Sequence, residues 1–414
     1  MEDVIVIGAG VAGLTAARIL ADRGLQVTIV EARNRIGGRV WTIHSAASTV
    51  PIEMGAEFIH GKPEQVFRTG LPLYEGEGIN YCQMDGRLQN CEQRWQTVDG
   101  VMAQLKNPGG HDESFEQFLH RSPASDTAKQ WATRYVEGFN AARKDRVSVK
   151  YLVQSDEAAE KIEGHRIFRL EGGYDRLLAY LTDDRVKIIL DSPVSRVEWS
   201  KGQVEVQSRN HKLSGRACIV TLPLGVLQHD AVRFSPRLNG KMDAAGKLIM
   251  GEVIRIGMRF REPFWIKTIP EARMILSDDP VMPTWWTTHP KESPVLIGWA
   301  AGERGLRLSG LPDEQVCKAA LRALSRITRI SVPELSSLLE EFHTHDWQSD
   351  PYSRGAYSYV AKGGMGAADE FAIPLEDTLF FAGEHVEDTG HSGTVHGAMM
   401  TGERAAHQLM ARLL

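Results

Sequence analysis

The chain begins with the stretch Asp3-Val4-Ile5-Val6-Ile7-Gly8-Ala9-Gly10-Val11-Ala12-Gly13. The apolar, β-branched run 4–7 predicts a buried parallel strand, and apolar residues at helical spacing over 11–23 predict a helix directly after it. Gly8 permits the tight turn, Gly10 lets the backbone approach a pyrophosphate, and Gly13 allows close packing of helix on strand. The helix N-terminus adds free N–H groups and the positive end of a dipole. Together these features predict a Rossmann-type dinucleotide site.

A second apolar run, 27–30, predicts the next strand of the same sheet. Glu31 ends that run about 20 residues after the glycines, where a carboxylate can accept hydrogen bonds from both hydroxyls of an adenosine ribose. A glycine-rich turn before a helix is common by itself. The ordered combination of strand, glycines, helix, strand and acid is what predicts a dinucleotide.

Another glycine-rich block lies near the other end of the chain. It runs from Phe381-Ala382-Gly383-Glu384-His385 to Gly393-Thr394-Val395-His396-Gly397-Ala398. We interpret the two blocks as parts of one dinucleotide site, so the chain leaves the cofactor domain, builds a second domain and returns. That order fits a flavoprotein better than a nicotinamide dehydrogenase.

Length and composition indicate a globular protein of two interleaved domains. The chain has 414 residues, 42% of them hydrophobic and 24% charged. No apolar run approaches the ~20 residues that cross a bilayer, and charged residues spread through 402–414 predict an amphipathic closing helix. We therefore expect no membrane partner. A net charge of -5 argues against nucleic-acid binding and mildly favours a cationic ligand.

The cysteines and the N-terminal residues lead to an expectation about the cellular compartment of the protein. Cys82, Cys91, Cys218 and Cys317 have neither metal-ligand nor redox spacing, so we expect free cysteines, no metal and a reducing cytoplasm. A predicted strand from Asp3 leaves no room for a signal peptide. The expected protein is cytoplasmic and a monomer or homodimer.

The predicted elements divide the chain into two domains. The α/β, Rossmann-type cofactor domain is expected to comprise residues 1–76, 170–240 and 345–414. The α+β substrate domain, with a mixed sheet and helices, is expected to comprise residues 77–169 and 241–344. Its first part is irregular and then helical over 114–142, which we interpret as a helical insertion on the substrate side.

Shorter patterns predict the elements within each domain. In the cofactor domain we expect a helix over 177–181 and strands over 186–190, 194–199, 204–208 and 217–222. In the substrate domain we expect strands over 249–260, 274–276, 285–288 and 295–301, with helices over 313–327 and 332–339.

Further motifs are spread along nearly the whole chain. They are Arg33-x-Arg35-x-Gly37-Gly38-Arg39, Met54-Gly55-Ala56-Glu57-Phe58-Ile59-His60-Gly61, Glu252-Val253-Ile254-Arg255, Pro263-Phe264-Trp265, Asp346-Trp347-x-x-Asp350-Pro351 and Gly355-Ala356-Tyr357-Ser358-Tyr359. With the two glycine-rich blocks, this set resembles the flavin-containing amine oxidase family. Within the family, the Ile-His-Gly and Thr-Val-His-Gly-Ala stretches look most like polyamine oxidases and lysine-specific histone demethylases.

The resemblance implies FAD in an extended pose, with a glutathione-reductase-like cofactor domain and the isoalloxazine at the boundary between the domains. The residues that it places on the cofactor are Gly8, Gly10, Ala12, Gly13, Glu31, Ala32, Arg33, Gly37, Gly38, Arg39, Met54, Gly55, Ala56, Glu57, Val194, Trp347, Gly383, Glu384, Thr394 and Val395.

Several of these positions carry a specific implied role. Arg39 reaches the pyrophosphate bidentately, and Arg33 covers the adenine or a phosphate. Glu384 contacts the ribityl chain or the pyrophosphate. The N–H groups of Thr394 and Val395 face the flavin pyrimidine and stabilise negative charge on the reduced ring. Val194 is equally consistent with a plain core valine, and Glu57 with a ribityl contact or a substrate ammonium.

The resemblance also implies a catalytic set of Arg255, Tyr357, His60, Trp285 and Thr394. Tyr357 corresponds to one of two cage tyrosines and Thr394 stands where the second would be, so the cage is at most half present. Ala356 replaces the cysteine of the covalent members, which implies noncovalent FAD. His60 lies near the cavity mouth or is a structural histidine, and strand alternation directs only one of Trp285 and Trp286 to the cavity.

Arg255 departs from the family pattern, which usually places a lysine there to hold a water against flavin N5. Arginine is longer, forked and effectively always charged. We hypothesise that Arg255 faces N5 and stabilises the anionic reduced flavin.

The predicted function is FAD-dependent oxidation of a primary or secondary amine, polyamine-like or otherwise bulky. Hydride passes to flavin N5, the imine hydrolyses, and O2 takes the electrons to give H2O2. One alternative is an L-amino acid oxidase, with Arg68, Arg166 or Arg169 aimed at the substrate carboxylate. Others are an amine dehydrogenase with another electron acceptor, a desaturase or porphyrinogen oxidase, and a non-catalytic flavin-binding or electron-transfer protein.

Overall fold

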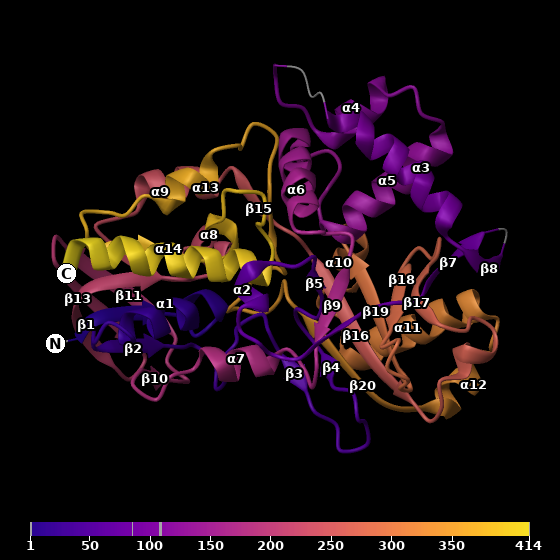
Figure 1. Ribbon diagram of the computed structural model, residues 1–414, viewed down its shortest axis with the longest axis horizontal. Coiled ribbons are helices and arrows are strands. Elements are labelled where there is room, and N and C mark those ends of the chain that lie inside the picture. Colours follow the sequence, from indigo (N-terminus) through magenta and orange to yellow (C-terminus); the bar gives the residue numbers. More distant parts are fainter. Residues whose placement is uncertain (1, 85, 107–109, 414) are drawn as a thin grey trace.

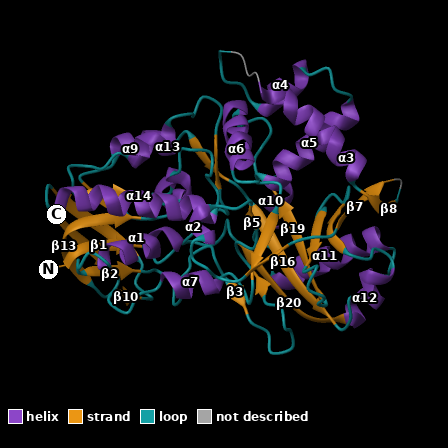
Figure 2. Ribbon diagram, in the orientation of Figure 1, coloured by secondary structure: helices purple, strands orange, loops and turns teal. Residues whose placement is uncertain are grey.

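The computed structural model describes residues 2–84, 86–106 and 110–413 and contains two large sheets (Figure 1). One sheet contains strands from near both ends of the chain, and the other is built mainly from strands in the middle of the chain. A group of helices from the segment 92–161 stands above the second of these sheets in this view, and only its last member, α6 (Val149–Lys161), lies near the junction of the two sheets (Figure 2).

The first sheet is a mostly parallel Rossmann-type sheet. Its strand order is β10 (Lys187–Ile189), β2 (Val27–Val30), β1 (Glu2–Ile7), β13 (Lys212–Val220), β12 (Gln203–Ser208), β11 (Val194–Ser200) and β14 (Arg233–Ser235), with β22 (Leu379–Phe381) paired to β13. β1 runs parallel to both β2 and β13. Strands from both ends and the middle of the chain therefore share one sheet, as the predicted fold class requires. The domain limits themselves stay a prediction.

Helices cover both faces of this sheet. On one face lie α1 (Val11–Ala21), α7 (Asp175–Leu181) and α14 (Val395–Leu413). On the other lie α8 (Leu224–Gln228), α9 (Asn239–Ala245) and α13 (Ala367–Ala372). The first and last long helices lie side by side (Figure 1), because Gly402 leaves room: a Cβ there would stand 2.4 Å from the Ala12 carbonyl oxygen. In the described part of the chain, every helix is too short or too polar to cross a membrane.

The second sheet is mixed. Its order is β20 (Leu339–Asp346), β16 (Val253–Phe260), β19 (Val295–Ala301), β18 (Thr284–Thr287), β17 (Ala272–Leu276), β7 (Ile79–Met84) and β8 (Arg87–Asn90). Its helices are α10 (Glu303–Leu308), α11 (Asp313–Thr328) and α12 (Val332–Leu338). The last two pack on one face around Ile256, Trp285 and Leu324. Every residue of β16 is buried, including Arg255.

Short elements connect the two sheets. The strand pair β3 (Thr42–Ile43) and β4 (Ile52–Glu53) and the three strands β5 (Ile59–His60), β9 (Ile167–Leu170) and β6 (Leu73–Glu75) lie near their junction. The remaining short helices are α2 (Glu64–Phe67), η1 (Ala103–Lys106), η2 (Phe264–Lys267) and η3 (Glu384–Val386).

Two predicted elements are divided in the structure. The strand over 249–260 breaks at Gly251 into β15 (Leu248–Met250), which pairs with β21 (Ser358–Val360), and β16. A Cβ at Gly251 would lie 2.8 Å from Ala141, so the break is a close contact with the helical insertion. The helical region 114–142 consists of α4 (Phe115–Arg121) and α5 (Asp126–Phe139) because Pro123 lacks the N–H that would continue the helix.

The insertion also contains two helices outside the predicted range 114–142. They are α3 (Glu92–Met102) and α6 (Val149–Lys161), and both carry many polar residues on their exposed sides. Their apolar residues, among them Val101 and Leu152, pack against Phe115 and Phe118 of α4. Tertiary packing therefore stabilises helices whose sequence pattern alone is weak.

The prediction of four free cysteines is wrong for two of them. Cys82 on β7 and Cys91 before α3 form a disulfide, with their Cα atoms 5.1 Å apart. The hairpin of β7 and β8 brings these residues together, and a spacing of nine residues carries no such signal by itself. Cys218 and Cys317 are free and buried. The disulfide joins the edge of the second sheet to the helical insertion.

This disulfide predicts a thiol count. Two thiols per chain should react with a thiol reagent in guanidinium without reductant, and four after reduction, since two of the four cysteines are paired. The Cys82→Ser/Cys91→Ser variant should lose about 2–3 kcal/mol of stability from the loop-closure term, read in urea unfolding. Cys317→Ser is the control. Four reactive thiols before reduction would contradict the pairing.

Candidate active site

The glycine-rich turn between β1 and α1 leaves a space that fits a pyrophosphate. Gly8 has φ +106°, and a Cβ on Gly13 would stand 2.1 Å from the Gly8 carbonyl oxygen, so both positions require glycine. Nothing lies within 4 Å of a Cβ built on Gly10. The first hydrogen bond of the helix runs from Leu14 N–H to Gly10 at 2.9 Å, so the N–H groups of 11–13 remain for an anionic ligand.

Glu31 is fixed at the end of β2. Its carboxylate accepts hydrogen bonds from the N–H of Ala9 at 2.7 Å and of Arg33 at 2.8 Å. Burial raises the pKa of this carboxyl. The Arg33 guanidinium instead binds Asp350 bidentately, at 2.8 and 2.9 Å. Arg33 therefore anchors the second half of the chain to the ribose end of the predicted cofactor site, a role that was not predicted for it.

Val194 begins β11 and is buried with the core on the other face of the sheet. Just before it, the N–H groups of Asp191 and Ser192 donate to the carbonyls of Arg33 and Glu31, both at 2.8 Å. Ala32 lies between those two carbonyls. The returning chain thus meets the acid-bearing end of β2, which is where the adenine end of the cofactor was predicted.

Glu384 joins three segments around Arg39. One carboxylate oxygen accepts from Arg39 at 2.7 Å, and the other accepts from the Ser358 hydroxyl at 2.7 Å and the Gly393 N–H at 3.1 Å. Arg39 also donates to the Ala356 carbonyl at 2.8 Å. Burial would raise the pKa of Glu384, but the charge of Arg39 together with the other groups around this carboxylate outweighs it, so the pKa lies below its usual value. This carboxylate organises the site in addition to any cofactor contact.

Thr394 caps the last helix. Its hydroxyl donates to the His391 carbonyl at 2.6 Å and accepts from the Gly397 N–H at 2.9 Å. The hydroxyl is therefore occupied in holding the turn, and it does not replace a cage tyrosine. The N-terminus of α14 at Val395 remains as the positive end of a 19-residue helix.

The loop 54–57 passes between the two sheets. The Trp347 indole N–H donates to the Met54 carbonyl at 3.1 Å, and Arg255 donates to the Gly55 carbonyl at 2.8 Å. A Cβ on Gly55 would stand 1.9 Å from the Arg39 carbonyl oxygen. Ala56 donates its N–H to that same carbonyl at 3.1 Å. Residues predicted to hold the cofactor are thereby brought together with Arg255 of the second sheet.

Glu57 is the centre of a buried ionic network. One oxygen accepts from Arg169 at 2.8 Å. The other accepts from Arg255 and from the Trp286 indole N–H, the latter at 2.9 Å. Burial alone would raise the pKa of Glu57, but the charges of Arg255 and Arg169 hold it below its usual value. Two guanidiniums and one carboxylate leave one net positive charge in this cluster.

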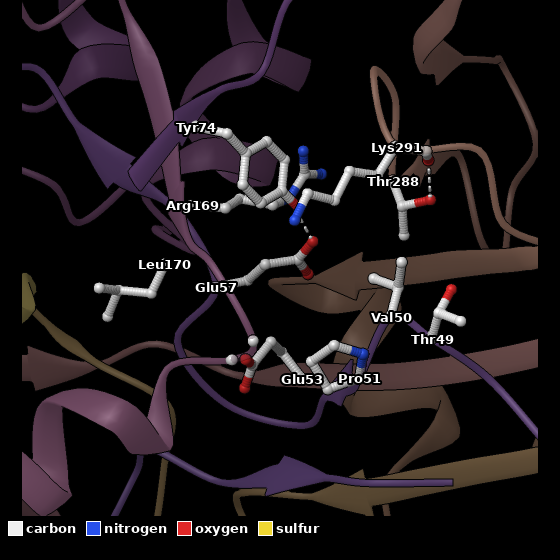
Figure 3. Close-up of a pocket in the computed structure, with 12 residues that line it drawn as sticks. Thr49, Val50, Pro51, Glu53, Glu57, Tyr74, Arg169, Leu170, Thr288 and Lys291 are labelled. Atoms are coloured by element: carbon white, nitrogen blue, oxygen red, sulfur yellow. Dashed lines mark hydrogen bonds and ion pairs between the residues drawn. The ribbon is translucent and has the colours of Figure 1, made fainter. Parts of the chain in front are cut away.

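A small pocket borders this network. Glu57 and Arg169 line it together with Glu53, Tyr74 and Lys291 (Figure 3). The Glu53 carboxylate accepts from the Tyr174 N–H and from the Thr42 hydroxyl, both at 2.7 Å. Burial raises the pKa of Glu53 to about 8. Glu53 therefore holds its proton at neutral pH and adds little charge to the network.

Trp286, and not the predicted Trp285, contacts the buried network around Arg255. Alternation along β18 puts Trp285 on the face that packs against α11 and α12, where it is fully buried. Trp286 lies on the opposite face, and the Arg255 guanidinium stands over its ring at 5.1 Å. Arg255 is paired across strands with Trp299 on the same face. Trp285, the tryptophan predicted for the catalytic set, therefore packs in the core of the second sheet, and Trp286 is the one that contacts Arg255.

Tyr357 directly precedes β21, which pairs with β15 in a separate two-stranded sheet. Its hydroxyl donates to the Phe139 carbonyl at 2.6 Å, and its ring packs with Ala356, Trp347 and Trp299. His60 packs edge-on against Phe139 with ring centres 5.3 Å apart. Tyr357 therefore links the predicted catalytic position to the helical insertion.

The histidines near the site are neutral. Burial lowers the pKa of His60 to about 4 and that of His396 to about 3. The His396 ring lies 3.2 Å from a ring nitrogen of His391, which is consistent with one neutral imidazole donating to another. These groups stay uncharged across the physiological range.

Sequence reasoning missed Phe139 as part of this region. It named Arg169 only as a candidate for a substrate carboxylate, Trp286 only as the alternative to Trp285, and Asp350 only as part of a family motif. Arg169 carries one signal, since it is a lone charge in the otherwise apolar run 167–170 that forms β9. Phe139 and Asp350 show their roles through contacts that span more than 200 residues, with Tyr357 and Arg33.

Comparisons with known proteins agree with this geometry. A family profile described as flavin containing amine oxidoreductase matches residues 11–69 and 82–410. Polyamine oxidase 4 of Oryza sativa subsp. japonica is 28% identical over 450 residues, covering 99% of this chain and 89% of that protein. Lysine-specific histone demethylase 2 of Homo sapiens is 29% identical, covering 99% of this chain but 53% of that protein.

Solved structures share the fold. Cyclohexylamine oxidase from Brevibacterium oxydans IH-35A has a TM-score of 0.82 at 21% identity, covering 100% of this chain and 99% of that one. Putrescine oxidase bound to putrescine has a TM-score of 0.80 at 21% identity, covering 99% of each chain. Because the family profile spans most of the sequence and the glycine turn fits a pyrophosphate, the chain belongs to the flavin-containing amine oxidoreductase family, with FAD as its cofactor.

Proposed function

We propose that this protein oxidises a carbon–nitrogen single bond of a primary or secondary amine and passes the electrons to O2, giving an imine that hydrolyses and H2O2. When bound, FAD supplies the hydride acceptor, flavin N5. The observation that carries the proposal is the buried cation at Arg255. Glu57 and the Gly55 carbonyl fix this guanidinium where the loop 54–57 meets the second sheet.

The chain's own residues then have distinct tasks. Arg255 keeps a positive charge at the boundary, which favours negative charge on a reduced ring. Tyr357, held through Phe139, presents one aromatic face to orient a neutral amine. The cofactor is held noncovalently, because Ala356 offers no thiol. His60 and His396 stay neutral and add no charge beside the amine.

The contacts disfavour an L-amino acid oxidase. Such an enzyme needs an arginine for the substrate carboxylate, and the three candidates are already paired. Arg68 pairs with Glu403, Arg166 with Glu75, and Arg169 with Glu57.

Anaerobic mixing of the holoenzyme with amines tests the proposal. The yellow flavin absorbance should bleach with at least one amine, and readmitted O2 should restore it with one H2O2 per flavin. Bleaching without recovery in O2 would indicate a dehydrogenase. A flavin that stays oxidised with every amine would indicate a non-catalytic flavoprotein.

Removing the buried cation should change the flavin potential. Arg255→Met should lower the midpoint potential by about 30 mV or more, equivalent to roughly tenfold in the two-electron equilibrium, because the reduced ring loses its cation. Arg259→Met is a matched control, since Arg259 lies on the same face of β16 but pairs with Glu341 at 2.9 Å. Potentials are read by dye equilibration in holoenzyme. If the flavin midpoint potential of the Arg255→Met variant is unchanged, Arg255 has only a structural role.

The rate of flavin reduction should rise with pH. A hydride leaves the carbon only when its amine nitrogen is unprotonated, so the rate should climb about tenfold per pH unit below the pKa of the bound amine and then level off. His60 and His396 are neutral above pH 5 because burial lowers their pKa values to about 4 and 3. Glu53→Gln tests the buried acid beside the Glu57 network, whose pKa burial raises to about 8, and should leave the profile in place. A flat profile in stopped-flow measurements would refute the requirement for a neutral amine.

A further inference from the structure

Glu53 and Glu57 are two buried acids of one short segment that have different partners. The residues are 7% and 8% exposed. Glu57 is paired with two guanidiniums. Glu53 instead accepts hydrogen bonds from two neutral donors, the Tyr174 N–H and the Thr42 hydroxyl, both at 2.7 Å. Burial disfavours the charged form of a carboxyl unless cations compensate it, so it raises the pKa of Glu53 to about 8 while Glu57 stays ionised.

The pocket in Figure 3 connects Glu53 with solvent. Its lining runs from the exposed residues Thr49 and Gly172 to the buried residues Glu53, Glu57 and Arg169. A proton can therefore reach or leave the Glu53 carboxyl while the surrounding chain stays folded.

The charges that act on Glu53 come from the buried cluster beside it. Those of Glu57 and Arg255 both influence its ionisation. Two phenols, Tyr74 and Tyr174, also lie within the electrostatic reach of Glu53, and burial raises the pKa of both. Both phenols therefore stay neutral where Glu53 titrates.

Two ion pairs lie farther out around the pocket. Lys291 donates to Glu171 at 2.6 Å, and His44 contacts Asp175 at 2.8 Å beyond Thr42. All four of these charged side chains are at least one-third exposed. Solvent screens both pairs, so the local field at Glu53 is set mainly by the buried cluster.

We propose that Glu53 sets the net charge of the cluster formed by Arg255, Arg169 and Glu57. With its proton, Glu53 leaves one positive charge on the cluster. Without it, the second carboxylate cancels that charge. The inference rests on the part of the proposed function in which the Arg255 cation favours negative charge on a reduced ring. Glu53 is thus a positioning residue that acts through Arg255.

Ionisation of Glu53 and reduction of the flavin should oppose each other, because both add negative charge beside the same cations. Since burial raises the pKa of Glu53 to about 8, the acid is neutral in both redox states at pH 6.5. At pH 9.5 the oxidised holoenzyme has lost this proton, and reduction draws a proton back to the carboxyl. The flavin should therefore be harder to reduce at alkaline pH than it would be without Glu53.

Midpoint potentials of the holoenzyme at two pH values test the inference. Wild type and Glu53→Gln should have the same potential at pH 6.5. At pH 9.5 wild type should lie about 30 mV below the variant, which is a tenfold difference in the two-electron equilibrium. The protons of the flavin itself are common to both proteins, so the difference isolates Glu53.

Glu171→Gln is the matched control, since Glu171 is an exposed carboxylate beside the same pocket. Its potential should differ from that of wild type by the same amount at both pH values. If Glu53→Gln instead shows an equal offset at both pH values, its role is only structural and the inference is overturned. Identical potentials at pH 9.5 would overturn it as well.

A measurement on wild type alone covers the case in which Glu53→Gln does not retain FAD. Photoreduction in weak buffer at pH 8.5 should take up about 1.5 protons per flavin, of which one belongs to the anionic reduced ring and the rest to Glu53. An uptake of one proton or fewer would overturn the inference.

These measurements need no amine, so they are separate from the test of amine oxidation. A pH-dependent difference in a flavin that no amine bleaches would support the role of Glu53 and refute the proposed function. Bleaching by an amine, together with an equal offset at both pH values, would do the reverse. The rising limb of the amine profile stays in place in Glu53→Gln, because the pKa of the substrate nitrogen sets it.

Discussion

The structure depends on the Glu57 carboxylate, which is buried between the guanidiniums of Arg255 and Arg169. A buried charge without its partner costs about 3–5 kcal/mol, so these side chains must remain together in the folded state. They come from the loop 54–57, from β16 and from β9, and Trp286 adds β18. One carboxylate thereby sets where the cofactor loop lies relative to the second sheet.

A second buried carboxylate, that of Glu384, holds separate segments together beside the first sheet. Glu384 binds Arg39 from the N-terminal segment, Ser358 from β21 and Gly393 before the last helix. Arg33 and Asp350 add a third ion pair across 317 residues. These contacts hold together the segments from both chain ends that were predicted to bind the cofactor, because each charge is satisfied by a segment distant in sequence.

The pairing of Arg255 with Glu57 also bears on chemistry. The family usually has a lysine at this position, whose charge depends on its surroundings, whereas an arginine stays protonated. Here the arginine is accompanied by a carboxylate and a second arginine, so the unit keeps one positive charge in total. The aromatic rings of Phe58 and Trp286 lie directly against those guanidiniums. The buried charge and the aromatic rings beside it are therefore parts of one arrangement.

Local patterns in the sequence were sufficient for the Rossmann turn, for the strands over 4–7, 27–30 and 295–301, and for the family's motif residues. These depend on properties of neighbouring residues, such as β-branched runs and glycines where a Cβ cannot fit. Other features depended on pairing: the break at Gly251, the Cys82–Cys91 disulfide and the choice of Trp286 over Trp285. The break and the choice of tryptophan are decided by partners far along the chain, and the disulfide by the β7–β8 hairpin that brings two cysteines nine residues apart together. The sequence alone thus determined the cofactor class and which residues carry charge, while only the tertiary structure decided which of those charges neutralise one another, because burial makes pairing a property of spatial neighbours.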